Sequence, residues 1–163
     1  MGFESDAKRG VVNHYGPRET NSKFGGEYGT KTKVKTVEYE FTYDDLPDGS
    51  TNALNYSIPA NARIISAKFI VDAAWTSTSG TTDLTVGLEQ ADGTAIDADG
   101  LLTAVNLADA SIEDAADVGS VITGSGALVG ASIGANAGEL VVGSTAADLT
   151  AGAARVIVEY TKA

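Results

Sequence analysis

The sequence predicts an all-β protein, an antiparallel β-sandwich preceded by an irregular segment. Short stretches alternate apolar and polar side chains with a period of two, which is the pattern of strands with one buried face. Glycine, asparagine and aspartate separate these stretches at short intervals, as in sandwiches and barrels. No strand–helix–strand rhythm occurs that would indicate a parallel α/β sheet.

Residues 1–31 are expected to form an extended irregular arm, and residues 32–163 the sandwich domain. The arm contains six glycines and keeps neither strand nor helix periodicity for more than a few residues. It nevertheless carries aromatic side chains, which disordered tails usually lack. We expect it to gain order on a partner surface, with packing on its own body and plain disorder as alternatives. The candidate partner-binding residues are Phe3, Val11, Val12, Tyr15, Arg18, Phe24 and Tyr28.

The first clear strand is predicted over residues 32–43. Its apolar face consists of Val37, Tyr39, Phe41 and Tyr43. A turn is expected over residues 44–49, because Asp-Gly supplies a position with positive φ. A short strand then runs through residues 54–58.

The strongest strand signal lies in residues 58–75, where Pro59 and Asn61 form a turn before a long alternating run. β-Branched and aromatic side chains alternate there with polar ones. The face predicted to point inward consists of Ile65, Ala67, Phe69, Val71, Ala73 and Trp75. The opposite face consists of Ile64, Ser66, Lys68, Ile70 and Asp72.

Further strands are predicted at three apolar runs and one isolated leucine, at residues 84–88, 140–142, 156–160 and Leu128. The stretch 94–122 is irregular. A short helix capped by Asp109 and ending at Ala116 is one interpretation, and a loop with short strand pieces is the other. No aromatic residue occurs between Trp75 and Tyr160, so the first, the long and the last strand are expected to supply the large side chains of one core.

Charge is distributed unevenly along the chain, whose net charge is −11. Residues 1–40 hold seven basic and six acidic side chains, whereas the remainder holds four and sixteen. Nucleic acid is not expected as a partner, because binding to phosphates requires clustered Lys and Arg. A membrane-spanning segment is not expected either, since no apolar run approaches the roughly 20 residues required.

The chain is not expected to be an enzyme or to hold a metal or cofactor. Without cysteine it has no thiol nucleophile, and His14 is the only histidine and has no triad partners near it in the sequence. Residues 97–100 partly match a calcium loop, but an EF-hand register would place Ala95 and Asn106 where carboxylates are needed. The favoured interpretation of this stretch is a solvated acidic loop. A looser calcium site is the alternative. Its candidate ligands are Asp92, Asp97 and Asp99.

Three stretches carry a family resemblance. They are Ile-Pro-Ala-Asn-Ala-Arg-Ile-Ile at residues 58–65, the strand at 83–88, and Asp-Leu-Thr-Ala-Gly-Ala-Ala at residues 148–154 before a closing strand at 155–160. Over about residues 37–161 the chain resembles domains of tailed-bacteriophage virion proteins, including head decoration (cement) proteins. The resemblance implies a β-sandwich of jelly-roll type with an extended N-terminal arm.

The resemblance also implies a function. The chain is expected to bind the outside of a phage capsid, which is assembled in the host cytoplasm, and to stabilise the shell. Its expected partners are the major capsid protein and further copies of itself, through a homo-oligomer or interlocking arms. No functional residue is carried over from the family. The alternative is a head- or tail-fibre module that contacts host-surface glycans.

Overall fold

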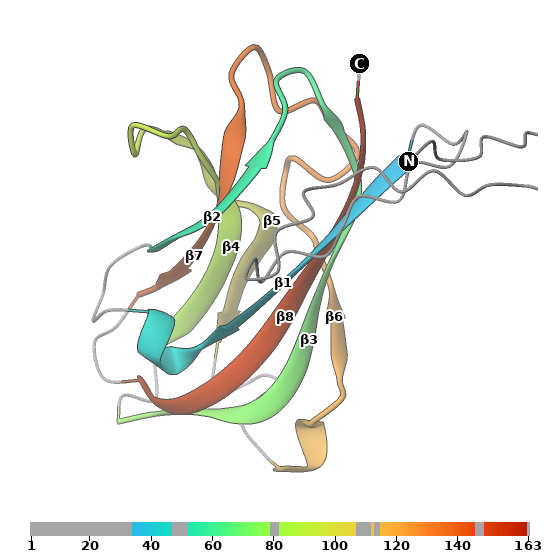
Figure 1. The fold of residues 1–163 in the computed structure, drawn as a ribbon. Helices are drawn as coiled ribbons and strands as arrows, with labels where there is room; N and C mark the ends of the chain where they lie inside the picture. The colour runs from blue at the N-terminus through green and yellow to red at the C-terminus, as the bar shows by residue number, and fades with distance from the viewer. Residues whose placement is uncertain are drawn as a thin grey trace, which may run out of the picture.

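The computed structural model describes residues 34–46, 52–78, 82–106, 112, 115–145 and 149–162. Eight strands occur within these residues, in two sheets (Figure 1). Their bounds are β1 Val34–Thr42, β2 Asn52–Ile58, β3 Arg63–Ser77, β4 Asp83–Glu89, β5 Ala95–Asn106, β6 Val121–Thr123, β7 Gly138–Ser144 and β8 Leu149–Thr161. Two short 3-10 helices accompany them, η1 Tyr43–Asp45 and η2 Ala115–Asp117. In the described part of the chain no helix is long and apolar enough to cross a membrane.

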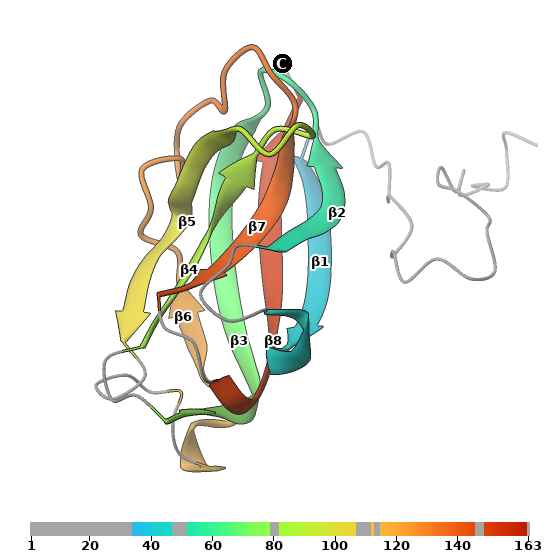
Figure 2. The ribbon, with the colours of Figure 1, turned by 90° about the vertical axis from the view of Figure 1, so that its left-hand side faces the viewer.

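The strands form two antiparallel four-stranded sheets that pack face to face (Figure 2). One sheet has the order β1-β8-β3-β6 and the other β2-β7-β4-β5. Strands 1 and 8, 2 and 7, 3 and 6, and 4 and 5 are therefore hydrogen-bonded neighbours. This order is that of an eight-stranded jelly roll, in which four antiparallel pairs roll up into a double sheet. The predicted antiparallel β-sandwich is confirmed.

The large side chains of three strands meet in one core, as the sequence indicates. Phe41 of β1, Phe69 of β3 and Trp75 of β3 are buried, with ring centroids 5.7–6.5 Å apart. Tyr160 of β8 is buried with them. Aliphatic side chains of the second sheet, such as Leu88, fill the opposite side of the core. Because aromatic pairs at these separations add to area burial, this cluster is a major source of stability.

The face prediction for β3 is correct for Ala67, Phe69, Val71 and Trp75, which are buried, and wrong for Ile64, Ile65 and Ala73. Ile64 is fully buried, whereas Ile65 is 43 % exposed. In the pairing of β3 with β8, Ile64 lies opposite Tyr160 and Ser66 lies opposite Glu159. Ile65 is therefore an extra residue of β3 in this ladder. Such a bulge shifts the inward and outward faces by one residue.

A second register shift places Ala73 on the outer face. Val71 pairs with Ala154 and Ala73 with Ala153, so Asp72 is the additional residue. Ala73 is exposed, and the alternation returns to the core only at Trp75. The predicted inward position of Ala73 is therefore wrong, for the same reason as that of Ile65.

Three other expectations differ from the structure. Residues 97–100, expected as an acidic loop, lie within β5. Leu128, expected in a strand, lies in a turn, where its N–H donates to Gly100 O at 2.8 Å. The stretch expected to precede the closing strand is itself part of β8, which begins at Leu149. Asp109 and most of the helix predicted after it lie outside the described residues, although η2 forms a single turn at its end.

The turn predicted at Pro59 and Asn61 is confirmed. Ala62 N–H donates to Pro59 O at 3.1 Å, and Asn61 has a φ of 60°. Asparagine tolerates this left-handed conformation better than most residues. The turn thus passes the chain from β2 in one sheet to β3 in the other.

Candidate interaction surface

The outer face of the β1-β8-β3-β6 sheet is the candidate interaction surface. Residues of four strands lie side by side on it because of the strand register. Glu40, Arg155, Ile70 and Val121 form one row across the sheet. The next row consists of Glu38, Ile157, Lys68 and Thr123.

Arg155 is the centre of an ion-pair network on this face. Its Nε lies 2.8 Å from Oδ2 of Asp72, and one of its terminal nitrogens lies 3.0 Å from Oε1 of Glu38. Hydrogen bonds with Asp72 first, and then with Glu38, raise the pKa of Arg155 above its ordinary value, so it stays charged. These side chains are about one-third to one-half exposed, so solvent screens the pairs. The network orders the surface more than it stabilises the fold.

Apolar side chains run diagonally across the same face. Ile157 of β8 and Ile70 of β3 are half-buried neighbours, and Val121 of β6 pairs with Ile70. Val121 is 54 % exposed, and Val118, just before β6, is 49 % exposed. These four residues are called the apolar strip below.

The exposed large apolar side chains of the described residues lie in this sheet or shortly before one of its strands. Within the described residues, the large apolar side chains that are exposed are Val34, Ile65, Val118 and Val121. Val34 opens β1, Ile65 is the bulge residue of β3, and the other two belong to the strip. Contiguous apolar side chains on a surface are typical of contact surfaces, and Val121 and Ile70 are direct neighbours in the strip. Sequence reasoning missed the strip, because its members are far apart in the chain.

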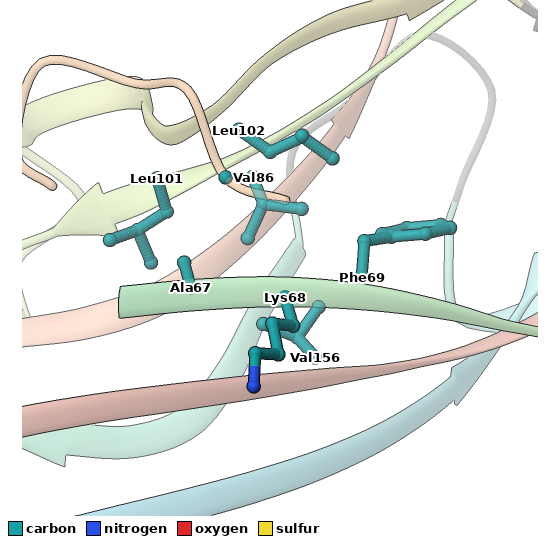
Figure 3. Close-up of a pocket in the computed structure, with 8 residues that line it drawn as sticks. Ala67, Lys68, Phe69, Val86, Leu101, Leu102 and Val156 are labelled. Carbon is teal, nitrogen blue, oxygen red and sulfur yellow. The ribbon is translucent and has the colours of Figure 1, made fainter. Parts of the chain in front are cut away.

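A small cavity lies between the sheets and offers no ligand site. Its volume is about 10 Å³, room for one water molecule at most. Figure 3 shows Ala67 and Phe69 from β3 facing Val86 and two leucines from the second sheet, while the amine of Lys68 points away from them. The lining is almost wholly apolar, as expected for an imperfection in core packing.

The acidic residues considered for calcium do not form a ligand cluster. Asp92 lies in the β4–β5 turn, where its Oδ1 accepts the Thr94 N–H at 2.9 Å and thereby lowers the pKa of Asp92. Asp97 and Asp99 lie farther along, in β5. Within the described residues no three or more His, Cys, Asp and Glu side chains gather in a way that could hold a metal ion.

The predicted partner-binding residues precede β1 and lie outside the described residues. They are Phe3, Val11, Val12, Tyr15, Arg18, Phe24 and Tyr28. His14 lies in the same part of the chain. The chain that follows them enters the sheet at Val34, which is exposed on the candidate surface.

Three solved structures share this fold over most of the chain. A chain in the capsid structure of Ralstonia phage GP4 is 20% identical with a TM-score of 0.56, and the alignment covers 80% of this chain and 84% of that one. A chain of the cyanophage Pam1 capsid is 17% identical with a TM-score of 0.56, covering 80% and 85%. A chain of the acidic stable capsid of Helicobacter pylori bacteriophage KHP30 is 17% identical with a TM-score of 0.55, covering 79% and 87%.

The sandwich has a fold found in phage capsids. At such low identities the likeness concerns backbone architecture and transfers no residue roles. No protein-family model matches the sequence, and a search of curated proteins finds no match. The alignments cover about four-fifths of this chain and more than four-fifths of each of the other chains.

Proposed function

We propose that the chain is a structural protein of a phage particle, which binds the outside of the capsid and stabilises the shell. The observation that supports this most is the similarity of about four-fifths of the chain to chains from three phage capsid structures. The composition is consistent with it, since an acidic body stays soluble and dispersed. The major capsid protein is the proposed partner, and the capsid exterior the proposed location.

Residues 1–31 are the proposed attachment arm. The arm adjoins β1, an edge strand of the sheet that carries the candidate interaction surface. An extended segment of this length spans up to about 100 Å, which is enough to cross a neighbouring subunit. Its aromatic side chains would supply apolar contact area, and Arg18 an ion pair or hydrogen bonds to a carboxylate. A segment that becomes ordered on binding covers a large area without a large body.

The outer face of β1-β8-β3-β6 is the proposed second contact with the shell. It carries exposed apolar side chains, among them Val34 and Val121, and its edge strand is β1, which follows the proposed arm in the sequence. Copies of the chain that touch through arms or sheet edges would add many weak contacts per particle, which raises the overall strength of attachment. Homo-oligomer formation is therefore part of the proposal, and light scattering of the purified chain tests it.

Capsid shells assembled without this chain provide the test of attachment. The full chain is expected to co-sediment with these shells and raise their resistance to heat, while a chain lacking residues 1–31 keeps its β-sheet circular dichroism but stays in the supernatant. Alanine at Phe3, Tyr15, Phe24 and Tyr28 should weaken binding strongly. Alanine at Ser5, Thr20, Asn21 and Ser22 is the matched control within the arm. Normal binding by the truncated chain would overturn the role of the arm.

The glycan-binding alternative is tested in parallel. An array of bacterial surface glycans, or whole host cells, would retain the full chain if it were a fibre module. The proposal expects retention on shells and none on glycans. Failure of the full chain to bind shells, combined with saturable binding to glycans, would replace the proposed function by the alternative.

A further inference from the structure

The two long sides of the sandwich differ in how their outer strands are covered. On the side where β5 and β6 lie, the β6–β7 loop, residues 124–137, bonds to the backbone of both sheets (Figure 2). The Gly124 N–H donates to Ala67 O of β3, and the Leu128 N–H donates to Gly100 O of β5, each at 2.8 Å. The loop therefore covers backbone groups on this side that could otherwise pair with a further strand.

The outer strands on the opposite side are β1 and β2, and β1 is the regular one of the two. The pairing of β2 with β7 shifts its register between Ala53 and Ser57. β1 pairs with β8 over nine consecutive residues without a bulge, and it contains no proline. Proline and bulges are two devices that keep further strands away from an edge. Because β1 has neither, its outer edge is a regular template for strand pairing.

Backbone groups of alternate residues of β1 point away from β8. The Thr42 N–H donates to Oδ2 of Asp45 at 2.9 Å, so this group does not face β8. In an antiparallel strand, every second residue directs its N–H and C=O to the same side. Those of Thr36, Glu38 and Glu40 therefore also face outward. Within the described residues, no other backbone segment bonds to them.

A second β1 strand fits this edge in an antiparallel register centred on Val37. In this register, Thr36 lies opposite Glu38 of the second copy, and Val37 lies opposite Val37. The residues with outward backbone groups then face one another, as hydrogen bonding between the strands requires. No like charges are directly opposite, whereas a register centred on Glu38 would place two glutamates opposite each other. Since such pairs destabilise a sheet, the charges select the register at Val37.

The charged side chains of β1, which would ordinarily keep a further strand away, are compatible with this pairing. Glu38 is bound to Arg155 of its own sheet at 3.0 Å. Lys35 lies opposite Tyr39 of the second copy. Burial first, and then the negative charge of Asp45, raises the pKa of Tyr39, which places Asp45 near that side chain. Lys35 of each copy would therefore approach Asp45 of the other, and the pairing brings opposite charges together.

We propose that β1 pairs with β1 of a second copy about a two-fold axis at Val37, which joins the two β1-β8-β3-β6 sheets into one continuous sheet. Backbone hydrogen bonds supply the affinity in such strand addition, and a two-fold contact closes on itself, so assembly stops at a dimer. The axis is perpendicular to the sheet, so both outer faces lie on the same side. This dimer deepens the proposed function and rests on it for the role of the doubled face: two copies of the candidate interaction surface would attach to a shell together.

The test uses the full chain in solution, with light scattering and amide hydrogen exchange over a range of protein concentrations. Light scattering should show a monomer that becomes a dimer as the concentration rises. The amides of Thr36, Glu38 and Glu40 should exchange rapidly in dilute solution and gain several-fold protection as the dimer forms. The amides of Val37 and Tyr39 face β8 and should be protected at every concentration.

Substitutions at the edge provide matched pairs of variants. Thr36→Pro removes an outward N–H but no bond to β8, because proline is tolerated where the N–H of an edge strand faces solvent. This variant should stay a monomer, whereas Thr36→Val, which keeps the N–H, should dimerise like the parent chain. Lys35→Glu should weaken the dimer several-fold by bringing like charges near Asp45, and Lys35→Arg should retain it. Circular dichroism verifies that each variant is folded.

Either of two results would overturn the β1 dimer. One is a parent chain that stays a monomer at every concentration. The other is a dimer in which the Thr36 and Glu38 amides gain no protection, since another surface would then form the contact. The experiment contains no shells, so its failure is distinct from that of the proposed function. A chain that dimerises through β1 but does not bind shells would contradict the function alone.

Discussion

Gly152 of β8 lies directly against the indole ring of Trp75. A Cβ atom on Gly152 would come within 2.8 Å of Cε2 of the ring and closer still to two other ring carbons. Gly152 also has a φ of +143°, a conformation that L-residues with side chains rarely adopt. The contact with the ring and the backbone conformation therefore each require glycine at this position.

Replacement of Gly152 by alanine is expected to destabilise the fold by about 3 kcal/mol or more, because overpacking and backbone strain add. Gly93→Ala is the control, since Gly93 has a φ of +82° but open space around it. That variant should lose only about 1–2 kcal/mol from the left-handed conformation. Urea unfolding of both variants measures the difference. Equal losses would show that the ring contact does not constrain Gly152.

Truncation of Phe69 tests the core and the bulge in β3 together. Phe69→Ala should lower the free energy of unfolding by about 3–5 kcal/mol, because it empties the centre of the aromatic cluster. Ile65→Ala, four residues earlier, should change it by less than about 0.5 kcal/mol, since Ile65 is exposed on the outer face. A large loss for Ile65→Ala in urea melts would mean that the outer face is buried in solution.

The ion pairs of Arg155 should respond to salt. Arg155→Met is expected to lower the free energy of unfolding only slightly at low ionic strength, because the pairs are partly exposed. The loss should shrink in about 1 M salt, where screening lengths fall to roughly 3 Å. Lys68→Met removes the same charge from the same face and serves as the control. A loss that does not depend on salt would point to packing of the Arg155 stem instead.

Asp92 should contribute to the stability of the fold in a pH-dependent way. Its pKa is lowered in the folded chain by the hydrogen bond from Thr94. Such a group stabilises the fold above its ordinary pKa and loses that contribution as the pH falls through the lowered value. The stability difference between the parent chain and Asp92→Ala should therefore be present at pH 7 and shrink toward about pH 2. Denaturant melts at both pH values check this.

Periodicity in the sequence was sufficient to predict the sandwich, because each buried strand face is encoded locally by alternating apolar residues. It was insufficient where a strand contains a bulge. Nothing in the local sequence marks Ile65 or Asp72 as an extra residue in the ladder, since both fit the alternating pattern. Their effect arises from how β3 pairs with β8, a strand roughly ninety residues away. The exchange of faces between Ile64 and Ile65 follows from that pairing alone.

The acidic stretch at residues 97–100 shows the same limit in another form. Asp and Gly together usually indicate a turn, and here they belong to a bulge that the glycines of β4 and the β6–β7 loop accommodate. The apolar strip could not be predicted from the local sequence either. Ile157, Ile70 and Val121 become neighbours only once the jelly-roll order brings β8, β3 and β6 together. The arm residues were predicted from composition alone, and binding experiments are their test.

The pairing of Val34 with Thr161 has a practical consequence. β1 starts and β8 finishes at one end of the sandwich (Figure 1). With the proposed arm fixed to a shell, a peptide fused beyond β8 would be held close to the shell surface. The turn between β4 and β5 belongs to the other sheet, away from the proposed contact face, and Gly93 in this turn has open space around it. For the display of an antigen or enzyme on particles, this turn is therefore the better site of insertion.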